Sequence, residues 1–103
     1  MKIFPVIWDK NAKESLRDIY LYIKEESPYS AKKVRLEILK ITASLSKMPE
    51  RFSTEKYLSK KGKEYHSVTK WNYKIIYRIA NNEVRILAII HTRRNTKVIE
   101  NIY

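Results

Sequence analysis

The stretch YKIIYRIANNEVRILAII, residues 73–90, decides the fold. It contains two apolar runs that meet at Asn81-Asn82, a pair that tolerates the positive φ angles of a tight two-residue hairpin. A turn of this kind sets the register of the two strands. The expected pairs are Ile79 with Val84, Tyr77 with Ile86, Ile75 with Ala88 and Tyr73 with Ile90, which together form one apolar face.

The other face of this hairpin is predicted to be basic. By alternation it carries Lys74, Ile76 and Arg78 from the first strand, and Arg85, Leu87, Ile89 and His91 from the second. The second strand then runs into Thr-Arg-Arg-Asn, residues 92–95, where one of the two arginines is expected to point toward the same face. The sequence therefore predicts a core on one side of the sheet and cations on the other.

Two amphipathic helices are expected before the hairpin. Residues 8–26 have apolar side chains at helical spacing, with a capping residue at position 9 or 11. Ser27-Pro28 supplies a cap followed by a proline in the first turn, so a second helix can begin almost at once. It should end near Met48, because Pro49 disfavours helical geometry in the residue before it. So short a link makes the pair an antiparallel helix hairpin.

The remaining segments complete a prediction of the fold class. Residues 1–8 read as a first strand, residues 51–64 as a loop and residues 65–70 as one more strand. The expected fold is α+β: an N-terminal strand, an antiparallel helix hairpin and then a three-stranded antiparallel sheet, with the helices packed on one face of the sheet. A chain of 103 residues has one core, so residues 1–103 should form a single domain. Trp71, two residues before Tyr73, is expected to share the core face and pack there.

The charge balance favours a polyanionic partner. The chain has 22 Lys and Arg against 11 Asp and Glu, a formal net charge of +11, which suits nucleic acid or an acidic protein segment. It has no cysteine, which excludes disulfides and thiolate zinc sites and fits a cytosolic location. The apolar run at the N-terminus is too short for a signal peptide or a membrane span, so no membrane partner is expected.

The sequence predicts neither a metal nor a cofactor. Its two histidines are far apart and its carboxylates are scattered, so no set of metal ligands can be recognised. A phosphate-binding glycine loop is excluded, because the chain has one glycine in all.

Several motifs follow one another along nearly the whole chain. They are Trp8, Ala12, Leu16, Ile19, Tyr22 and Ile23 in the first helix, Ser27-Pro28 with Ala31, Leu45 with Pro49, YKIIY at residues 73–77, and the closing strand with its basic end at residues 86–94. In these motifs and their order the chain resembles the RelE/ParE superfamily of bacterial toxins, known from type II toxin–antitoxin and plasmid stabilisation systems. The resemblance implies the fold given above and a cognate antitoxin partner.

Two activities are implied by the resemblance. RelE-like members cut mRNA in the ribosomal A site, and such cleavage needs a base, an acid and cations around one phosphate. Lys74 stands where the family has an arginine and keeps the charge but not the bidentate grip, while Arg94 matches the arginine after the last strand. His66 and His91 could transfer protons because histidine titrates near neutral pH. Arg94, Lys74, His91 and His66 are thus the catalytic candidates if the chain is a nuclease, and His91 is preferred over His66 because it shares the predicted face of Lys74.

ParE-like members poison DNA gyrase and need no catalytic residues. This activity is favoured, because RelE-like enzymes carry a lysine pair on the strand before YKIIY and residues 65–68 here contain no lysine. The expected function is therefore a ParE-like growth inhibitor acting on gyrase and neutralised by an acidic antitoxin. Two alternatives stay open: a RelE-like nuclease acting on the translating ribosome and its mRNA, and a degenerate member that only binds its antitoxin.

Six further cations are candidates for contact with the target or with RNA. They are Arg93, Arg78 and Arg85 in or after the hairpin, and Lys60, Lys61 and Lys63 in the loop. The simpler interpretation is that they keep a strand end and a loop solvated. A functional role would appear as steep salt dependence of binding.

Overall fold

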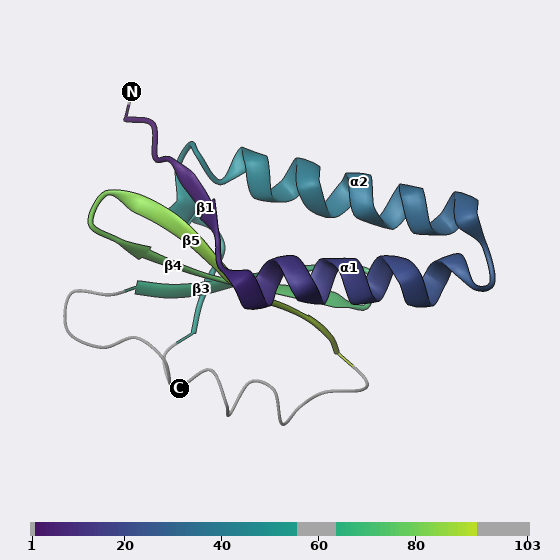
Figure 1. Cartoon of the computed structure of the whole chain (residues 1–103). Coiled ribbons are helices and arrows are strands. Elements are labelled where there is room, and N and C mark those ends of the chain that lie inside the picture. The colour runs from purple at the N-terminus through teal and green to yellow at the C-terminus, as the bar shows by residue number, and fades with distance from the viewer. Residues whose placement is uncertain (1, 56–63, 93–103) are drawn as a thin grey trace.

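The computed structural model of the chain describes residues 2–55 and 64–92, and it contains a five-stranded sheet with two helices against it (Figure 1). The strand order is β1-β5-β4-β3-β2. The three central strands are those predicted, namely β3 (Glu64–Lys70), β4 (Tyr73–Ala80) and β5 (Glu83–His91), all antiparallel. The α+β class is confirmed, and two short strands extend the predicted sheet at its edges.

The edge strands explain how both ends of the helix hairpin attach to the sheet. β1 (Val6–Trp8) pairs in parallel with β5, from Val6 opposite Val84 to Trp8 opposite Ile86. β2 (Ser53–Thr54) pairs antiparallel with β3 and lies in the segment that was predicted to be a loop. Alternation alone did not reveal a two-residue strand, because so short a strand has no period to detect.

The helices are α1 (Lys10–Lys24) and α2 (Pro28–Ser44), which run antiparallel beside each other with α1 crossing in front of the sheet in Figure 1. Ser27 caps α2 as predicted, its Oγ accepting a hydrogen bond from Ser30 N at 3.1 Å. α2 ends earlier than predicted, and the Arg51 guanidinium donates to the carbonyls of its last residue, Ser44, and of Lys47 and Met48 beyond it. No helix in residues 2–55 and 64–92 is long and apolar enough to cross a membrane.

The core lies between the helices and one face of the sheet, which we call the helical face. Its buried members are Ala12, Leu16, Ile38 and Leu45 from the helix hairpin with Ile75, Tyr77, Val84, Ile86 and Ile89 from the sheet. The Tyr77 hydroxyl, inside this core, donates a hydrogen bond to the carbonyl of Pro49. Burial raises the pKa of Tyr77 well above its usual value, so this hydroxyl stays protonated and remains a donor.

A β-bulge at Leu87 changes the predicted register. Tyr77 lies opposite Ile86 as expected, but Ile76 lies opposite Ala88, so Leu87 is an extra residue on β5. Beyond the bulge the alternation is inverted: Ile75 pairs with Ile89 and Tyr73 with His91. The predicted pairs of Ile75 with Ala88 and of Tyr73 with Ile90 are therefore wrong.

The sheet face away from the helices, which we call the distal face, is consequently mixed rather than simply basic. Ile76, Ala88 and Ile90 form a second buried cluster there, with Tyr65 and Leu87 packed against it. By alternation and register the distal face also carries Ser67, Thr69, Lys74, Arg78 and Arg85. Ile89 and His91, which were predicted for this face, lie on the helical face instead.

The two hairpin turns differ in chemistry. Asn81 and Asn82 have φ angles of 54° and 61°, as predicted for a tight turn at this pair. Trp71, in the turn between β3 and β4, has a φ of 54° and is 49% exposed, so the expectation that it packs in the core is wrong. A bulky residue in this left-handed conformation costs on the order of 1–3 kcal/mol.

Candidate functional site

Lys74 is held on the distal face by a carboxylate. The backbone N–H of Glu55 donates to Tyr65 O at 2.7 Å, which continues the β2–β3 ladder and turns the Glu55 side chain toward β3 and β4. Its Oε1 accepts a hydrogen bond from Ser67 Oγ at 2.6 Å and lies 2.7 Å from Lys74 Nζ. The charge of Lys74 is thus balanced within the protein.

Glu55 remains ionised in this arrangement. Burial by itself would raise the pKa of its carboxyl, but the hydrogen bonds from Lys74 and Ser67 and the Lys74 charge outweigh that effect and lower the pKa. A phosphate could reach Lys74 only by competing with this carboxylate. Lys74 is therefore a poorer phosphate ligand than an unpaired lysine.

Arg78 and Arg85 lie opposite each other across β4 and β5, on the distal face as predicted. Arg85 bonds to Asp9 Oδ1 at 3.2 Å and to Glu83 Oε2 at 3.3 Å. Arg78 differs, because its buried Nε has no hydrogen-bond partner in the part of the chain that the structure describes. Of the two, Arg78 is thus the one with an unsatisfied buried donor in the described residues.

His66 is a buried residue of β3. It lies opposite Tyr77 on the helical face, is 3% exposed, and stacks on the Tyr77 ring with centroids 5.5 Å apart. Its Nδ1 lies 2.9 Å from Phe52 O, so that nitrogen carries a proton, while Nε2 lies 3.3 Å from Glu64 Oε2. The ring fixes the segment that contains Phe52 to the sheet and faces away from Lys74.

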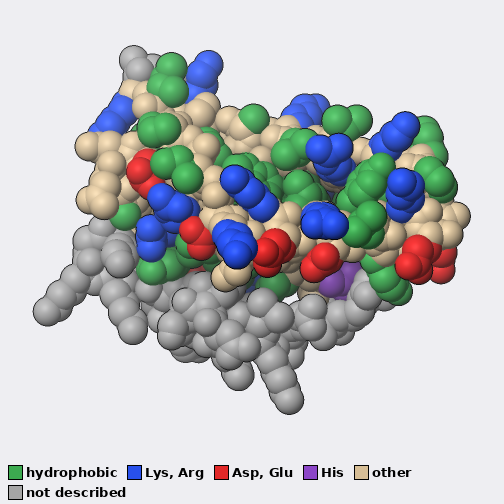
Figure 2. Space-filling model, viewed as in Figure 1, with side chains coloured by type: hydrophobic (Ala, Val, Ile, Leu, Met, Phe, Trp, Pro, Cys, Tyr) green, Lys and Arg blue, Asp and Glu red, His purple; other side chains and the backbone are tan. Residues whose placement is uncertain are grey.

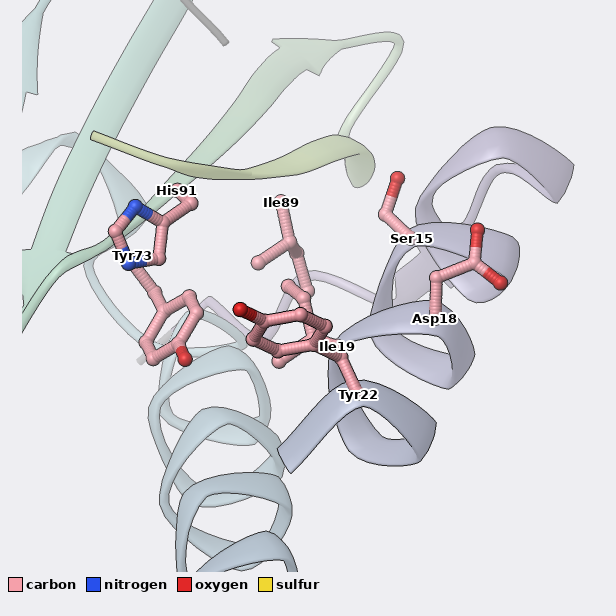
Figure 3. A pocket seen from close by; sticks show the side chains of 7 residues that line it. All are labelled: Ser15, Asp18, Ile19, Tyr22, Tyr73, Ile89 and His91. Atoms are coloured by element: carbon pink, nitrogen blue, oxygen red, sulfur yellow. The ribbon is translucent and has the colours of Figure 1, made fainter. Parts of the chain in front are cut away.

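His91 ends β5 on the helical face, so the prediction that it shares a face with Lys74 is wrong. The bulge at Leu87 is the cause, because it moves the side chain of every later residue in β5 to the opposite face of the sheet. His91 packs edge-on against Tyr73, at 5.4 Å between centroids, and lines a pocket of about 270 Å³ between α1 and the sheet. Figure 3 shows Ser15 and Asp18 of α1 across this pocket from His91 and Tyr73, with Ile19, Tyr22 and Ile89 between them.

The other predicted site residues lie outside the described residues. These are Arg93 and Arg94 after β5, and Lys60, Lys61 and Lys63 between β2 and β3. Among the residues that are described, no three His, Asp or Glu side chains come close enough to hold a metal ion.

A groove between α1 and α2 was not predicted. It has a volume of about 410 Å³ and is lined by Trp8, Leu16, Tyr20 and Leu39, with Lys13, Arg17 and Arg35 beside them. The Arg35 guanidinium lies over the Tyr20 ring, 5.8 Å from its centroid. The helical periodicity did carry a signal for it, since Tyr20 and Leu16 are four residues apart and Arg17 follows Leu16 in the sequence.

Figure 2 shows that basic and hydrophobic side chains are mixed over both helices, as they are in this groove. Lysine and arginine side chains are spread over both helices and interleaved with hydrophobic ones, while most of the acidic side chains in this view lie below them, in a row across the middle of the picture. An apolar surface with a basic border is suited to an acidic protein partner.

Comparison with solved structures shows the same fold in three toxin–antitoxin systems. The chromosomal ParDE system of P. aeruginosa aligns with a TM-score of 0.68 and 20% identity, over 88% of this chain and 98% of that one. The archaeal RelE–RelB complex of Pyrococcus horikoshii OT3 gives 0.66 and 16%, over 91% and 99%. The RelBE2 complex of Mycobacterium tuberculosis gives 0.61 and 21%, over 88% and 93%.

Comparison at the level of sequence identifies the family. No curated protein matches the chain in sequence. The family model of the ParE toxin of type II toxin–antitoxin systems, parDE, matches residues 6–96, which include every helix and strand described above. The chain therefore belongs to the ParE toxin family of type II toxin–antitoxin systems.

Proposed function

We propose that this toxin arrests bacterial growth by poisoning DNA gyrase and that an acidic antitoxin neutralises it. The match to the ParE family model supports the choice of gyrase, because ParE-like members of the superfamily act on that enzyme. On this account the toxin works by binding and has no catalytic residues of its own.

The observation that carries the proposal is the separation of the candidate nuclease residues. Cleavage of RNA needs proton-transfer groups and cations around one phosphate. Here Lys74 lies on the distal face and is paired with Glu55, whereas His66 and His91 lie on the helical face. A single phosphate could not contact Lys74 and either histidine across the sheet, which supports binding rather than cleavage as the mode of action.

The antitoxin is proposed to occupy the groove between α1 and α2. The solved relatives named ParDE, RelE–RelB and RelBE2 are toxin–antitoxin systems or complexes, which supports such a partner here. The apolar floor of Leu16, Tyr20 and Leu39 suits the apolar side of an amphipathic helix. Arg17 and Arg35 would then form ion pairs with acidic residues that flank the apolar side of the antitoxin helix.

Induced expression in bacteria, with two reporters followed together, tests the proposal. A gyrase poison is expected to stop growth and induce the DNA-damage response, while translated messages stay intact. Message cut at ribosomal A sites without DNA damage would instead support the nuclease alternative, and normal growth would contradict the toxin function.

A further inference from the structure

The outward face of α2 carries large apolar side chains that no part of the core needs. Tyr29 is 77% exposed and Leu36 is 66% exposed. They alternate along the helix with Lys33 and Lys40 at spacings of four, three and four residues, which places all four on one side. The buried residues of α2, among them Ile38, lie on its opposite side. This is a second exposed face, apart from the groove that Arg35 and Leu39 line.

Trp71 extends this face onto the sheet. The indole is 49% exposed, with Lys70 Nζ at 5.0 Å and Lys33 Nζ at 6.0 Å from the ring centroid. Lys70 Nζ also lies 3.8 Å from Glu37 Oε1, which ties the turn between β3 and β4 to α2. Tyr29, Lys33, Leu36, Lys40, Lys70 and Trp71 thus form one continuous patch, which we call the α2–Trp71 surface.

The backbone at Trp71 shows that the turn is not optimised for closing the hairpin. Its φ of 54° is one that asparagine or glycine adopts readily and tryptophan does not. The turn between β4 and β5 in the same molecule uses Asn81 and Asn82 for positive φ angles. A strained residue that exposes a large aromatic ring is an observation that points to binding rather than to folding.

The composition of the patch indicates the chemistry of its partner. Tyr29, Leu36 and Trp71 offer apolar anchors of the kind that fill pockets in protein partners, and tryptophan and tyrosine are enriched among residues that dominate binding energy. The cations around them are lysines, point charges without the bidentate fork that arginine offers to phosphate. An acidic protein surface with an apolar pocket satisfies both features, whereas a nucleic-acid backbone leaves Leu36 unmatched.

We propose that the α2–Trp71 surface binds an acidic surface of the protein that this toxin inhibits, with Trp71 inserted in an apolar pocket of that protein. This inference rests on the proposed function and adds to it the face that meets the target. Because the patch does not include the groove between α1 and α2, target binding and antitoxin binding use different residues.

The variant Trp71→Asn separates binding from folding. It makes the turn Asn-Asn, as at residues 81–82, so the melting temperature should not fall. Growth arrest should be lost at induction levels where the wild type acts, and affinity for purified gyrase should weaken by at least about tenfold. Leu21→Gln is the matched control, because Leu21 is 46% exposed on α1, outside the patch, and its replacement should change neither readout.

The outcomes distinguish this inference from the function on which it rests. Wild-type growth arrest and gyrase affinity in folded Trp71→Asn would overturn the inference and leave gyrase as the target. Growth arrest by a wild type that does not bind gyrase would overturn the gyrase proposal, and loss of arrest in Trp71→Asn would still support the surface. Trp71-dependent binding to DNA or to anionic lipid vesicles, with unchanged growth arrest, would overturn the assignment to a protein partner. A wild type that does not arrest growth would overturn both proposals.

Discussion

Lys74 and Glu55 form an ion pair on the distal face, with Nζ 2.7 Å from Oε1 and only 24% and 19% of the two side chains exposed. Ser67 donates to the same carboxylate oxygen at 2.6 Å. The residue that stands where RelE-like enzymes carry a catalytic arginine is thus part of a local structural network. Replacement of Lys74 should therefore lower the free energy of unfolding more than it changes any activity.

The first prediction concerns Glu55→Gln, which removes the charge that faces Lys74. The folded-state pKa of Glu55 is lowered, so its contribution is present above the unfolded pKa of about 4.3 and is lost as the pH falls through the folded value. The variant should therefore be less stable than the wild type at pH 7 by roughly 1 kcal/mol, a difference that shrinks below about pH 4. Urea unfolding at several pH values measures it.

A matched control for Glu55 is Glu14→Gln, on the exposed surface of α1. This change should leave the pH profile of stability close to that of the wild type. A stability difference for Glu55→Gln that is the same at pH 3 and at pH 7 would contradict the ion pair.

The second prediction concerns His66. Its replacement by alanine removes the stack on Tyr77 and the bond to Phe52 O, so the free energy of unfolding should fall by about 1–3 kcal/mol. Glu64→Gln, which changes only the 65% exposed partner of Nε2, should cost much less. Denaturant titration compares the two variants, and a His66→Ala protein as stable as the wild type would show that the ring has no structural role.

The sequence allowed most of the fold to be predicted, because its signals were local. Asn81-Asn82 marks its turn by residue type, and Ser27-Pro28 marks a helix start by the same kind of chemistry. The bulge at Leu87 has no such mark. Since residues 86–90 are all apolar, either register gives an apolar strand, and nothing in the sequence shows where the alternation inverts.

The candidate site was harder to predict than the fold for the same physical reason. The face on which His91 lies depends on the bulge, and the pairing of Lys74 depends on Glu55, which lies in a segment without periodicity. Trp71 was assigned to the core by its offset from Tyr73, but a turn intervenes and a turn does not preserve alternation. Contacts between segments distant in sequence decide what these residues face.

The third prediction tests the bulge itself. Deletion of Leu87 removes the extra residue and leaves Ile86 and Ile89 on the helical face, with Ala88 and Ile90 on the distal face, in regular alternation. The deletion variant should therefore still fold cooperatively, as judged by thermal unfolding followed by circular dichroism. Leu87→Ala keeps the bulge and should also fold, with a loss of about 1–2 kcal/mol, since Leu87 is only partly buried. A deletion variant that fails to fold while Leu87→Ala folds would contradict the bulge, because in a strand without a bulge the deletion would invert the faces of Ala88, Ile89 and Ile90.

The fourth prediction concerns the groove between the helices. Arg17→Glu combined with Arg35→Glu should weaken binding of the cognate antitoxin by at least about tenfold, because both cations lie beside the apolar floor. Growth arrest by the variant should persist even when the antitoxin is co-expressed. Lys10→Glu, a charge reversal at the start of α1 outside the groove, should still be rescued. Full rescue of the double variant would place the antitoxin elsewhere.

The most direct test of the central claim is the supercoiling of relaxed plasmid by purified DNA gyrase, titrated with the purified toxin. We predict that the wild type inhibits supercoiling in a concentration-dependent way, and that folded Lys74→Ala inhibits it as well, because the proposed mechanism gives Lys74 no catalytic role. Unchanged supercoiling at all toxin concentrations, together with mRNA cleavage in a purified translation system that Lys74→Ala abolishes, would contradict the claim.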